Sequence, residues 1–350
     1  LQTNSSTGVL GYRYGIWNAS QPGFFAFGAS TTKTNVGTLG INSYGANAGL
    51  GDGHPWLFDS SATKSVASLY VAGHTAFAYG IDDNFIPGTG GGWMVGGADN
   101  GSSVTLPAVW TYSGGSWIAA PNVITGFGAL SGGVAYDVAT NGVVVGYAYT
   151  NVSGTSYQRA FAHNISGGSY TLASGDSLYC HSSVSGGAGM SKAWSIVHVL
   201  SDNTVAGEAD AVATTIASGT FTSSFACLWK NAANAPTMLG TLAQGETSAF
   251  RDIKGTNSEY LVVGYSDSGA DASYHATLYS SYFAYIYANM NPSGTIDLND
   301  PSFVQSATGW RMASAVGVST TGYITVNGVY GGTQWPVLLV PLTGYDGHLQ

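Results

Sequence analysis

Phe250-Arg251-Asp252-Ile253, Val262-Val263-Gly264 and His275-Ala276-Thr277-Leu278-Tyr279 are three short runs in one continuous stretch of the sequence. Each is rich in β-branched or aromatic residues, which favour strands. The segments between them are rich in Asn, Asp, Ser and Gly, which favour turns. The stretch therefore predicts three consecutive β-strands joined by turns.

The same pattern recurs along the chain. Its first element has a small or aromatic residue, two variable positions and a β-branched residue: Ala78–Ile81, Ala135–Val138, Ala193–Ile196, Phe250–Ile253 and Ala315–Val318. Its second element ends in glycine: Met94–Gly96, Val144–Gly146, Val205–Gly207, Val262–Gly264 and Val326–Gly328. Its third element is an apolar run with seven copies: Phe24–Phe27, His54–Phe58, Pro107–Trp110, Arg159–His163, Phe225–Trp229, His275–Tyr279 and Trp335–Val340. Successive glycines lie about 50 to 64 residues apart, enough for four short strands per unit.

A unit of four strands cannot bury both of its faces alone, and stacking units around an axis buries them against one another. The sequence therefore predicts an all-β fold in which residues 1–350 form a single β-propeller domain of about seven blades, with six as the alternative. A solenoid is the rival architecture, but its repeats are usually shorter. We expect the glycines after the second strands to occupy tight hairpins with positive φ. We also expect Tyr79, Tyr136 and Trp194 to lie between neighbouring blades.

The segment Val9–Gly11 resembles the second strand of a unit, and the eight residues before it are mostly polar. An unpaired strand edge is costly. We therefore expect the two termini to meet in a shared blade or in adjacent blades, with the C-terminal run 335–342 as the donor strand.

The composition excludes several classes of function. Lys and Arg number 9 and Asp and Glu 18, so that charged residues make up 8% of the chain and the net charge is −9. A chain with so few cations and no basic cluster does not suit nucleic acid. No apolar stretch of about 20 residues is present, so we expect no membrane span. Low charge also weakens the repulsion between copies of a protein, which favours self-assembly.

Four segments of the chain resemble the HAF repeat of bacterial extracellular proteins: Phe225–Trp229, Met238–Leu242, Val262–Ser266 and His275–Tyr279. The consensus of that repeat is roughly His-Ala-Phe-Leu-Trp, Asp-Leu-Gly-Thr-Leu-Gly-Gly, Ala-x-x-Ile-Asn and Val-Val-Gly-Tyr-Ser. The resemblance extends from about residue 20 to 342, although the histidine of the repeat stands in register only at His54 and His275. It implies a secreted or surface-attached, propeller-like array. It implies no settled activity and supplies no catalytic residues.

Two carboxylates are candidate catalytic groups. Asp137 and Asp252 stand at equivalent places, directly before the β-branched residue of the first strand. A pair of carboxylates can serve as acid and base in a polysaccharide lyase or glycoside hydrolase, and Arg251 could orient an anionic sugar. Capping of turns is the competing interpretation. An enzyme of this kind is therefore the alternative function, and a binding protein is the leading one.

Three tryptophans beside Gly- or Ser-rich turns are candidate binding residues: Trp93, Trp117 and Trp310. Their rings present apolar faces on which sugars can stack, although aromatic side chains can equally fill contacts between blades. We expect an extracellular or cell-surface protein that binds carbohydrate or other copies of itself.

Three further features concern chemistry at single residues. Cys180 and Cys227 lie 47 residues apart, close to one repeat, which predicts neighbouring strands and one disulfide. Burial as two small apolar side chains is the other interpretation. No cofactor is indicated, and calcium is the only metal that the oxygen-rich loops suggest: Asp82–Asn84, Asp267–Asp271 and Asp297–Asp300. Five sequons are candidate glycosylation sites: Asn4, Asn18, Asn100, Asn151 and Asn164.

Overall fold

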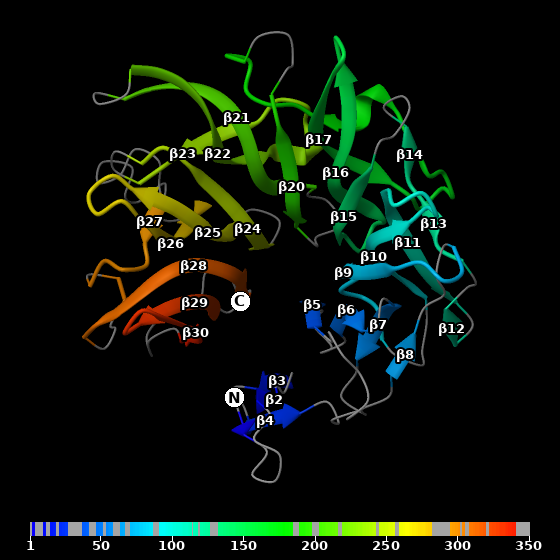
Figure 1. Cartoon of the computed structure of the whole chain (residues 1–350), viewed down its shortest axis with the longest axis horizontal. Helices are drawn as coiled ribbons and strands as arrows, with labels where there is room; N and C mark the ends of the chain where they lie inside the picture. The colour runs from blue at the N-terminus through cyan, green and yellow to red at the C-terminus, as the bar shows by residue number, and fades with distance from the viewer. Residues whose placement is uncertain are drawn as a thin grey trace. The chain divides into compact units, whose positions relative to one another are not determined.

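The structure is a computed structural model (Figure 1) and describes part of the chain in detail. The described residues are 2–3, 10–11, 15–18, 21–26, 37–41, 47–51, 54–58, 64–66, 71–86, 91–113, 115–117, 120–126, 132–184, 189–197, 203–215, 219–242, 245–255, 259–281, 295–301, 303–304, 308–319 and 322–340. They form an all-β fold with several four-stranded antiparallel sheets, as the sequence predicts.

The chain divides into two compact units, each described here by itself. The first consists of Leu1–Ile124 and Val134–Asp137, and the second of Thr125–Gly133 and Val138–Gln350. The first unit contains the pairs β1 (Gln2–Thr3) with β2 (Leu10–Gly11) and β3 (Gly15–Asn18) with β4 (Gln21–Ala26). Its first larger sheet is β5 (Gly37–Ile41), β6 (Asn47–Gly51), β7 (His54–Phe58) and β8 (Lys64–Val66). Its second is β9 (Ala76–Ile81), β10 (Gly92–Asp99), β11 (Thr105–Ser113) and β12 (Ser116–Trp117), with β13 (Asn122–Val123) also paired to β11.

The later sheets follow the chain order (Figure 1). One contains β15 (Gly133–Val138), β16 (Val143–Val152), β17 (Thr155–Asn164) and β19 (Ser177–Leu178); the next contains β20 (Ser191–Ile196), β21 (Val205–Thr215), β22 (Gly219–Trp229) and β23 (Thr237–Gly240). They are followed by β24 (Ser248–Gly255), β25 (Tyr260–Ser268), β26 (Ser273–Ser280) and β27 (Thr295–Asp297), and by β28 (Trp310–Val318), β29 (Ile324–Tyr330) and β30 (Thr333–Leu339). A parallel pair, β14 (Thr125–Gly126) with β18 (Thr171–Leu172), and the 3-10 turns η1 (Ser174–Asp176) and η3 (Lys230–Ala232) complete the described elements.

The glycines of the second strands have a different role from the one expected. In three sheets the first strand carries a β-bulge at the second residue of the repeat motif: Tyr79, Trp194 and Arg251. The glycine lies inside the second strand, opposite the first motif residue, as Gly264 lies opposite Phe250. A Cβ at Gly264 would overlap the carbonyl oxygen of Ala249. The prediction of positive φ in hairpins is therefore wrong for these positions, because the bulge, and not a turn, excludes a side chain there.

Within each unit, larger sheets that follow one another in the chain pack on one another. Within the second unit, β20 contacts β16 and β17, β24 contacts β21 and β22, and β28 contacts β25 and β26. Within the first unit, β9 likewise contacts β5, β6 and β7. The hydrophobic clusters of the second unit accordingly contain side chains from two consecutive sheets, such as Leu228 with Ile253 and Val263 with Met312. Apolar layers between sheets are therefore the core of this unit.

Two buried serines join consecutive sheets by hydrogen bonds. Ser191, which begins β20, accepts a hydrogen bond from the Ala160 amide (3.0 Å) and donates one to the Leu178 carbonyl (2.7 Å). Ser248, which begins β24, accepts one from the Ala226 amide (2.8 Å) and donates one to the Gly240 carbonyl (2.5 Å). In both cases one hydroxyl satisfies backbone groups of the third and fourth strands of the preceding sheet.

The described strands near the two ends of the chain pair within their own sheets, and the meeting of the termini in a shared blade or in adjacent blades stays a prediction, since residues 4–9 and 341–350 lie outside the described residues. Strand β30 pairs with β29 in its own sheet, and Leu10–Gly11 pairs with Gln2–Thr3. Strand β30 therefore completes the sheet of β28, because the turn after β29 brings β30 back alongside β29. Within the described part of the chain this sheet has three strands, and no strand is paired to the outer edge of β30.

Candidate functional site

Two of the predicted binding tryptophans, Trp93 and Trp117, lie in the first unit. Trp117 packs on the core, with its ring 5.6 Å from the Phe85 ring and 5.2 Å from the Tyr112 ring. Trp93 is half-buried in β10, opposite Thr111. The ring contacts of Trp117 thus favour a packing role over binding, whereas the considered alternative, a contact between blades, stays a prediction.

Trp310 also packs against a core cluster, that of the second unit, but its half-buried ring lies beside two exposed aromatic side chains. It is stacked on Tyr330, with ring centroids 5.2 Å apart and an interplanar angle of 28°. Tyr330 is 51% exposed and Trp335 is 43% exposed. In the strand register Trp310 lies opposite Tyr330, and Trp335 lies opposite Gly328, two residues from Tyr330. The three rings therefore share one face of the sheet, which we call the aromatic platform (Trp310, Tyr330 and Trp335).

Glycines shape the aromatic platform. Gly331 and Gly332 connect Tyr330 to Thr333 with positive φ values of 57° and 80°, as a two-residue hairpin of type I′ requires. This tight turn holds β30 close to β29. A Cβ at Gly328 would lie 3.1 Å from the Trp310 ring and 2.7 Å from the Val337 side chain. Glycine at 328 therefore leaves room for Trp310 to lie over the strand.

A second cluster surrounds Arg251, at the bulge of β24. The centre of its guanidinium group lies 3.9 Å from the Trp194 ring centroid and 5.2 Å from the Tyr265 ring centroid. Its Nη2 donates a hydrogen bond of 3.4 Å to the Tyr265 hydroxyl. Trp194 is the equivalent bulge residue of the preceding sheet, so the repeat brings the two residues together. Trp194 and Arg251 thus fill the contact between consecutive sheets.

Glu208 is held by its own partners in this cluster. Trp194 Nε1 donates a hydrogen bond of 3.2 Å to Glu208 Oε1, and Lys192 Nζ lies 3.5 Å from the same oxygen. Burial raises the pKa of the Tyr265 hydroxyl and the charge of Glu208 adds to this, against the opposing effect of Arg251. Tyr265 therefore stays protonated at neutral pH and is not suited to act as a base. We call these residues the Arg251 cluster: Lys192, Trp194, Glu208, Arg251 and Tyr265.

Asp252 has a structural arrangement of hydrogen bonds. Its Oδ1 accepts from the Ser195 hydroxyl (3.0 Å) and the Ile253 amide (2.9 Å), and its Oδ2 accepts from the Val318 amide (2.9 Å). Asp252 belongs to the second unit and Asp137 to the first. Arg251 contacts aromatic rings, while Asp252 contacts β20 and β28. These contacts favour a connecting role for Asp252 over the catalytic one.

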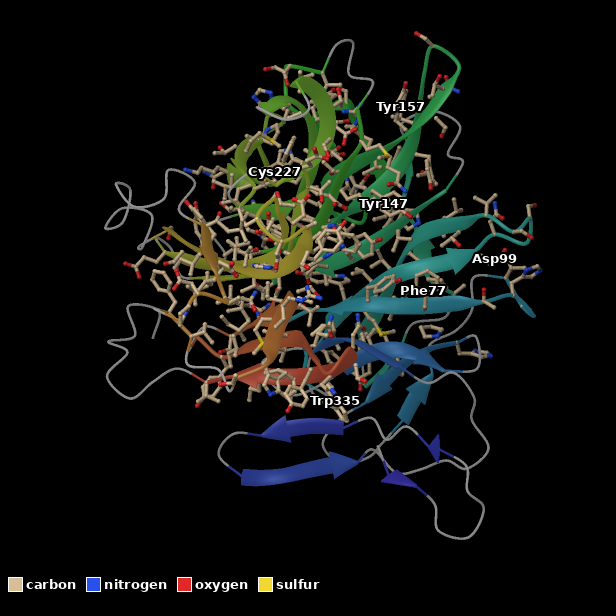
Figure 2. All side chains as sticks on the ribbon, turned by 60° about the vertical axis from the view of Figure 1, so that its left-hand side comes forward. Phe77, Asp99, Tyr147, Tyr157, Cys227 and Trp335 are labelled. Atoms are coloured by element: carbon tan, nitrogen blue, oxygen red, sulfur yellow. The ribbon has the colours of Figure 1, made fainter. Side chains whose placement is uncertain are left out.

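The cysteines do not form the expected bridge. Cys180 and Cys227 are both free and buried, and they share one hydrophobic cluster. Cys227 lies in β22 (Figure 2), while Cys180 follows β19 in the preceding sheet. Burial raises the pKa of Cys227 well above its usual value, with the charge of Glu208 adding to the effect. A thiol held protonated in this way is unreactive, as the alternative of two small buried apolar side chains implies.

The acidic loops use their carboxylates internally. Asp82 Oδ1 accepts a hydrogen bond of 2.9 Å from the Asn84 amide, and Asp267 Oδ1 accepts from the amides of residues 246 and 247. Asp297 Oδ2 lies 2.7 Å from His275 Nδ1, and Asp271 Oδ2 lies 3.0 Å from His275 Nε2. Across the residues that the structure describes, no three His, Cys, Asp or Glu side chains form a group able to hold a metal ion.

Three of the five sequon asparagines have described side chains, and each is used in a turn. Asn100 Oδ1 accepts a hydrogen bond from the Ser102 amide, Asn151 Oδ1 from the Gly154 amide, and Asn164 Oδ1 from the Ser166 amide. Asn151 and Asn164 are exposed. Asn4 and the side chain of Asn18 lie outside the described residues.

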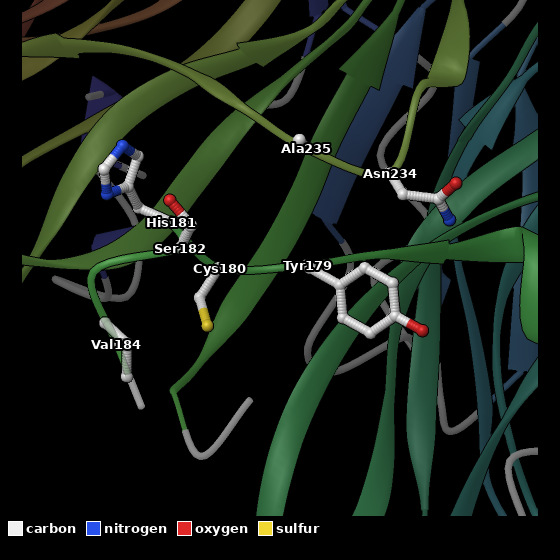
Figure 3. Close-up of a pocket in the computed structure, with 7 residues that line it drawn as sticks. All are labelled: Tyr179, Cys180, His181, Ser182, Val184, Asn234 and Ala235. Atoms are coloured by element: carbon white, nitrogen blue, oxygen red, sulfur yellow. The ribbon is translucent and has the colours of Figure 1, made fainter. Parts of the chain in front are cut away.

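A pocket of about 270 Å³ lies between the segment after β19 and the residues after η3 (Figure 3). Its lining includes Tyr179, Cys180, His181 and Asn234. Several of its polar groups already have partners: Asn234 Nδ2 donates to the Ser177 carbonyl (2.7 Å), and His181 Nδ1 lies 2.8 Å from the Ser183 hydroxyl. The pocket therefore offers a ligand fewer unused polar groups than the Arg251 cluster does.

No protein-family model matches the chain, and no curated protein matches it. Within the described part of the structure, no helix has both the length and the apolar character needed to cross a membrane.

Proposed function

We propose that this protein is a secreted or cell-surface β-propeller of about seven blades that binds carbohydrate through the aromatic platform. The observation that carries the proposal is the pair of exposed rings, Tyr330 and Trp335, beside the half-buried Trp310 on one sheet face. Large aromatic side chains are costly to leave in water, and exposed apolar patches mark interaction sites. The exposed faces of aromatic rings suit the C–H faces of sugar rings.

The repeat architecture supports the propeller part of the proposal. Six described sheets have three or more strands, and the pairs β1–β2 and β3–β4 would contribute one further blade; without it the count is six. The first strand of a sheet repeatedly contacts the second and third strands of the sheet before it, as neighbouring blades do. The resemblance to the HAF repeat and the low charge support an extracellular or surface location.

Self-assembly is a second candidate, favoured by the edge strand β30. No described strand pairs with its outer edge, and its residues 333–336 are exposed. Unpaired edges can add a strand from another copy. Pro336 lacks an amide hydrogen, which limits such pairing to part of the strand. The catalytic alternative has weaker support, because both oxygens of Asp252 are engaged in hydrogen bonds.

Carbohydrate binding is tested by applying the labelled protein to a glycan array and to insoluble polysaccharides. We expect binding to a restricted set of glycans. A protein that binds none of them would overturn the proposal. Sedimentation over a range of concentrations tests the second candidate, which requires association as the concentration rises; a monomer at every concentration would exclude it. Product assays with the same polysaccharides separate binding from lyase or hydrolase activity.

A further inference from the structure

We propose that the Arg251 cluster is a second binding site that takes the carboxylate of an acidic sugar, such as a uronic acid. The site lies on β20, β21, β24 and β25, whereas the aromatic platform lies on β28, β29 and β30. The two sites therefore use different residues, and the experiment on one site can contradict its proposal without affecting the proposal for the other.

The first argument is the unused hydrogen-bonding capacity of Arg251. A guanidinium group has five N–H donors. The hydrogen bond described for Arg251 is the 3.4 Å contact with the Tyr265 hydroxyl, and no carboxylate in the described part of the structure forms an ion pair with it. The protein has only nine Lys and Arg side chains against 18 Asp and Glu. An arginine without a carboxylate partner in such an acidic chain favours an external anion.

The second argument is the orientation of the guanidinium group. Its centre lies 3.9 Å from the Trp194 ring centroid, and the Tyr265 ring stands on another side at 5.2 Å. A guanidinium group that is fixed against aromatic rings has lost part of its rotational freedom before a ligand arrives, which lowers the entropic cost of binding. Arginine can bind a carboxylate with two parallel hydrogen bonds, a geometry that lysine does not provide.

The third argument is that the carboxylate of the cluster, that of Glu208, has other partners. Glu208 Oε1 is held by Trp194 Nε1 at 3.2 Å and lies 3.5 Å from Lys192 Nζ. Lys192 thus offsets the charge of Glu208, and Glu208 in turn fixes the indole on which Arg251 lies. The arrangement leaves the positive charge of Arg251 for a ligand.

The aromatic surroundings indicate the rest of the ligand. Tyr265 contacts Tyr274 edge-to-face, with ring centroids 5.3 Å apart, and Tyr274 is 52% exposed. An exposed ring beside an arginine offers an apolar surface to the C–H groups of a sugar while the arginine binds its acid group. A sugar ring that carries a carboxylate matches both features, whereas a simple carboxylate matches only one.

Nuclear magnetic resonance of the ¹⁵N-labelled protein tests the site directly. The Trp194 indole N–H is assigned by its loss in Trp194→Phe and is followed during titration with glucuronate, glucose or acetate at constant ionic strength. We expect saturable shifts with glucuronate, none with glucose, and binding of acetate about tenfold weaker, because acetate lacks the sugar ring. Equal affinity for acetate, or no shift with glucuronate, would overturn the proposal.

Variants of the arginine complete the test. Arg251→Gln should weaken glucuronate binding about 10- to 100-fold, since hydrogen bonds to a charged group are lost. Arg251→Lys keeps the charge but not the paired donors, so its affinity for glucuronate should lie between that of the unmodified protein and that of Arg251→Gln. It replaces Arg251→Gln in the test if that variant folds poorly. Lys254→Gln removes one positive charge from the same strand and should change affinity by no more than about twofold. Unchanged affinity in both Arg251 variants would contradict the site.

Discussion

Ser195 donates a hydrogen bond from its hydroxyl to Oδ1 of Asp252 over 3.0 Å, although 57 residues separate the two in the sequence. Ser195 lies in β20 and Asp252 in β24, and the other oxygen of Asp252 accepts from the Val318 amide in β28 at 2.9 Å. One carboxylate therefore connects the first strands of three consecutive sheets. It stabilises the packing of the sheets at a position where the repeat motif otherwise varies.

Removal of this carboxylate should destabilise the second unit. We expect Asp252→Ala to lower the free energy of unfolding by about 2 kcal/mol or more, because the Ser195 hydroxyl and the Val318 amide lose their acceptor. Ser195→Ala should cost about 1 kcal/mol. Urea denaturation of both variants and of the double variant gives the coupling between the residues, which should be about 0.5 kcal/mol or more. Strictly additive effects would show that the two side chains do not interact.

A glycine inside a second strand allows a test of whether the bulge excludes a side chain there. Gly264→Ala places a methyl group against the Ala249 carbonyl oxygen, in the backbone of the neighbouring strand. We expect a loss of about 3 kcal/mol in stability, because a backbone atom cannot move aside cheaply. Gly167→Ala is the matched control, since a Cβ there meets nothing within 4 Å. Similar melting temperatures for both variants would contradict the proposed role of the bulge.

The serine between consecutive sheets can be tested separately. Ser248→Ala leaves the Ala226 amide and the Gly240 carbonyl without the hydroxyl that satisfies them. We expect a loss of about 1–3 kcal/mol on chemical denaturation, the range found for an unsatisfied buried polar group. Ser182→Ala, at an exposed position, should change stability by no more than about 0.5 kcal/mol. A Ser248→Ala variant as stable as this control would show that water replaces the hydroxyl without loss.

His275 predicts a pH dependence of stability. Burial alone would lower its pKa, but hydrogen bonds to Asp297 and Asp271 and the charges of both outweigh burial, so the pKa is raised above 6.5. The stabilisation is therefore complete below about pH 6.5 and is lost as the pH rises through the raised pKa. The hydrogen bond to His275 lowers the pKa of Asp271. The contribution of Asp271 to the stability is therefore present above the ordinary pKa of an aspartate and is lost as the pH falls through the lowered pKa.

The measurement is the melting temperature of the unmodified protein and of His275→Gln from pH 5 to pH 9. The difference between them should be largest near pH 5 to 6 and should shrink towards pH 9, as the imidazole loses its proton. The subtraction removes the effect of the other groups of the protein that titrate in this range. A difference that is constant with pH would show that His275 contributes through packing alone.

The sequence predicted the strands well because their signal is local. Alternation of β-branched residues with turn residues located β24, β25 and β26 close to their observed bounds. It misassigned the role of Gly264 because the cause lies in another strand, where the bulge at Arg251 moves the Ala249 carbonyl towards it. A repeated glycine indicates that a side chain is excluded, but the sequence does not tell whether a turn or a neighbouring backbone excludes it.

The candidate sites were predicted only in part. Trp310 was identified from its place beside a turn, but Tyr330 and Trp335 join it through strand register, which depends on the two-residue turn at Gly331-Gly332. Arg251 was identified for its charge, yet its partners Trp194 and Tyr265 come from the bulge positions and from packing between sheets. Side chains that meet across sheets leave no local pattern in the sequence.

Calorimetric titration with the glycan that binds most strongly tests carbohydrate binding at the aromatic platform most directly. We expect Tyr330→Ala and Trp335→Ala each to weaken binding about tenfold or more, since each removes a ring from the contact surface. Phe303→Ala is the control, because Phe303 is an equally accessible aromatic residue, 45% exposed, outside the platform; its affinity should match that of the unmodified protein. Unchanged affinity in both platform variants would contradict the proposed function.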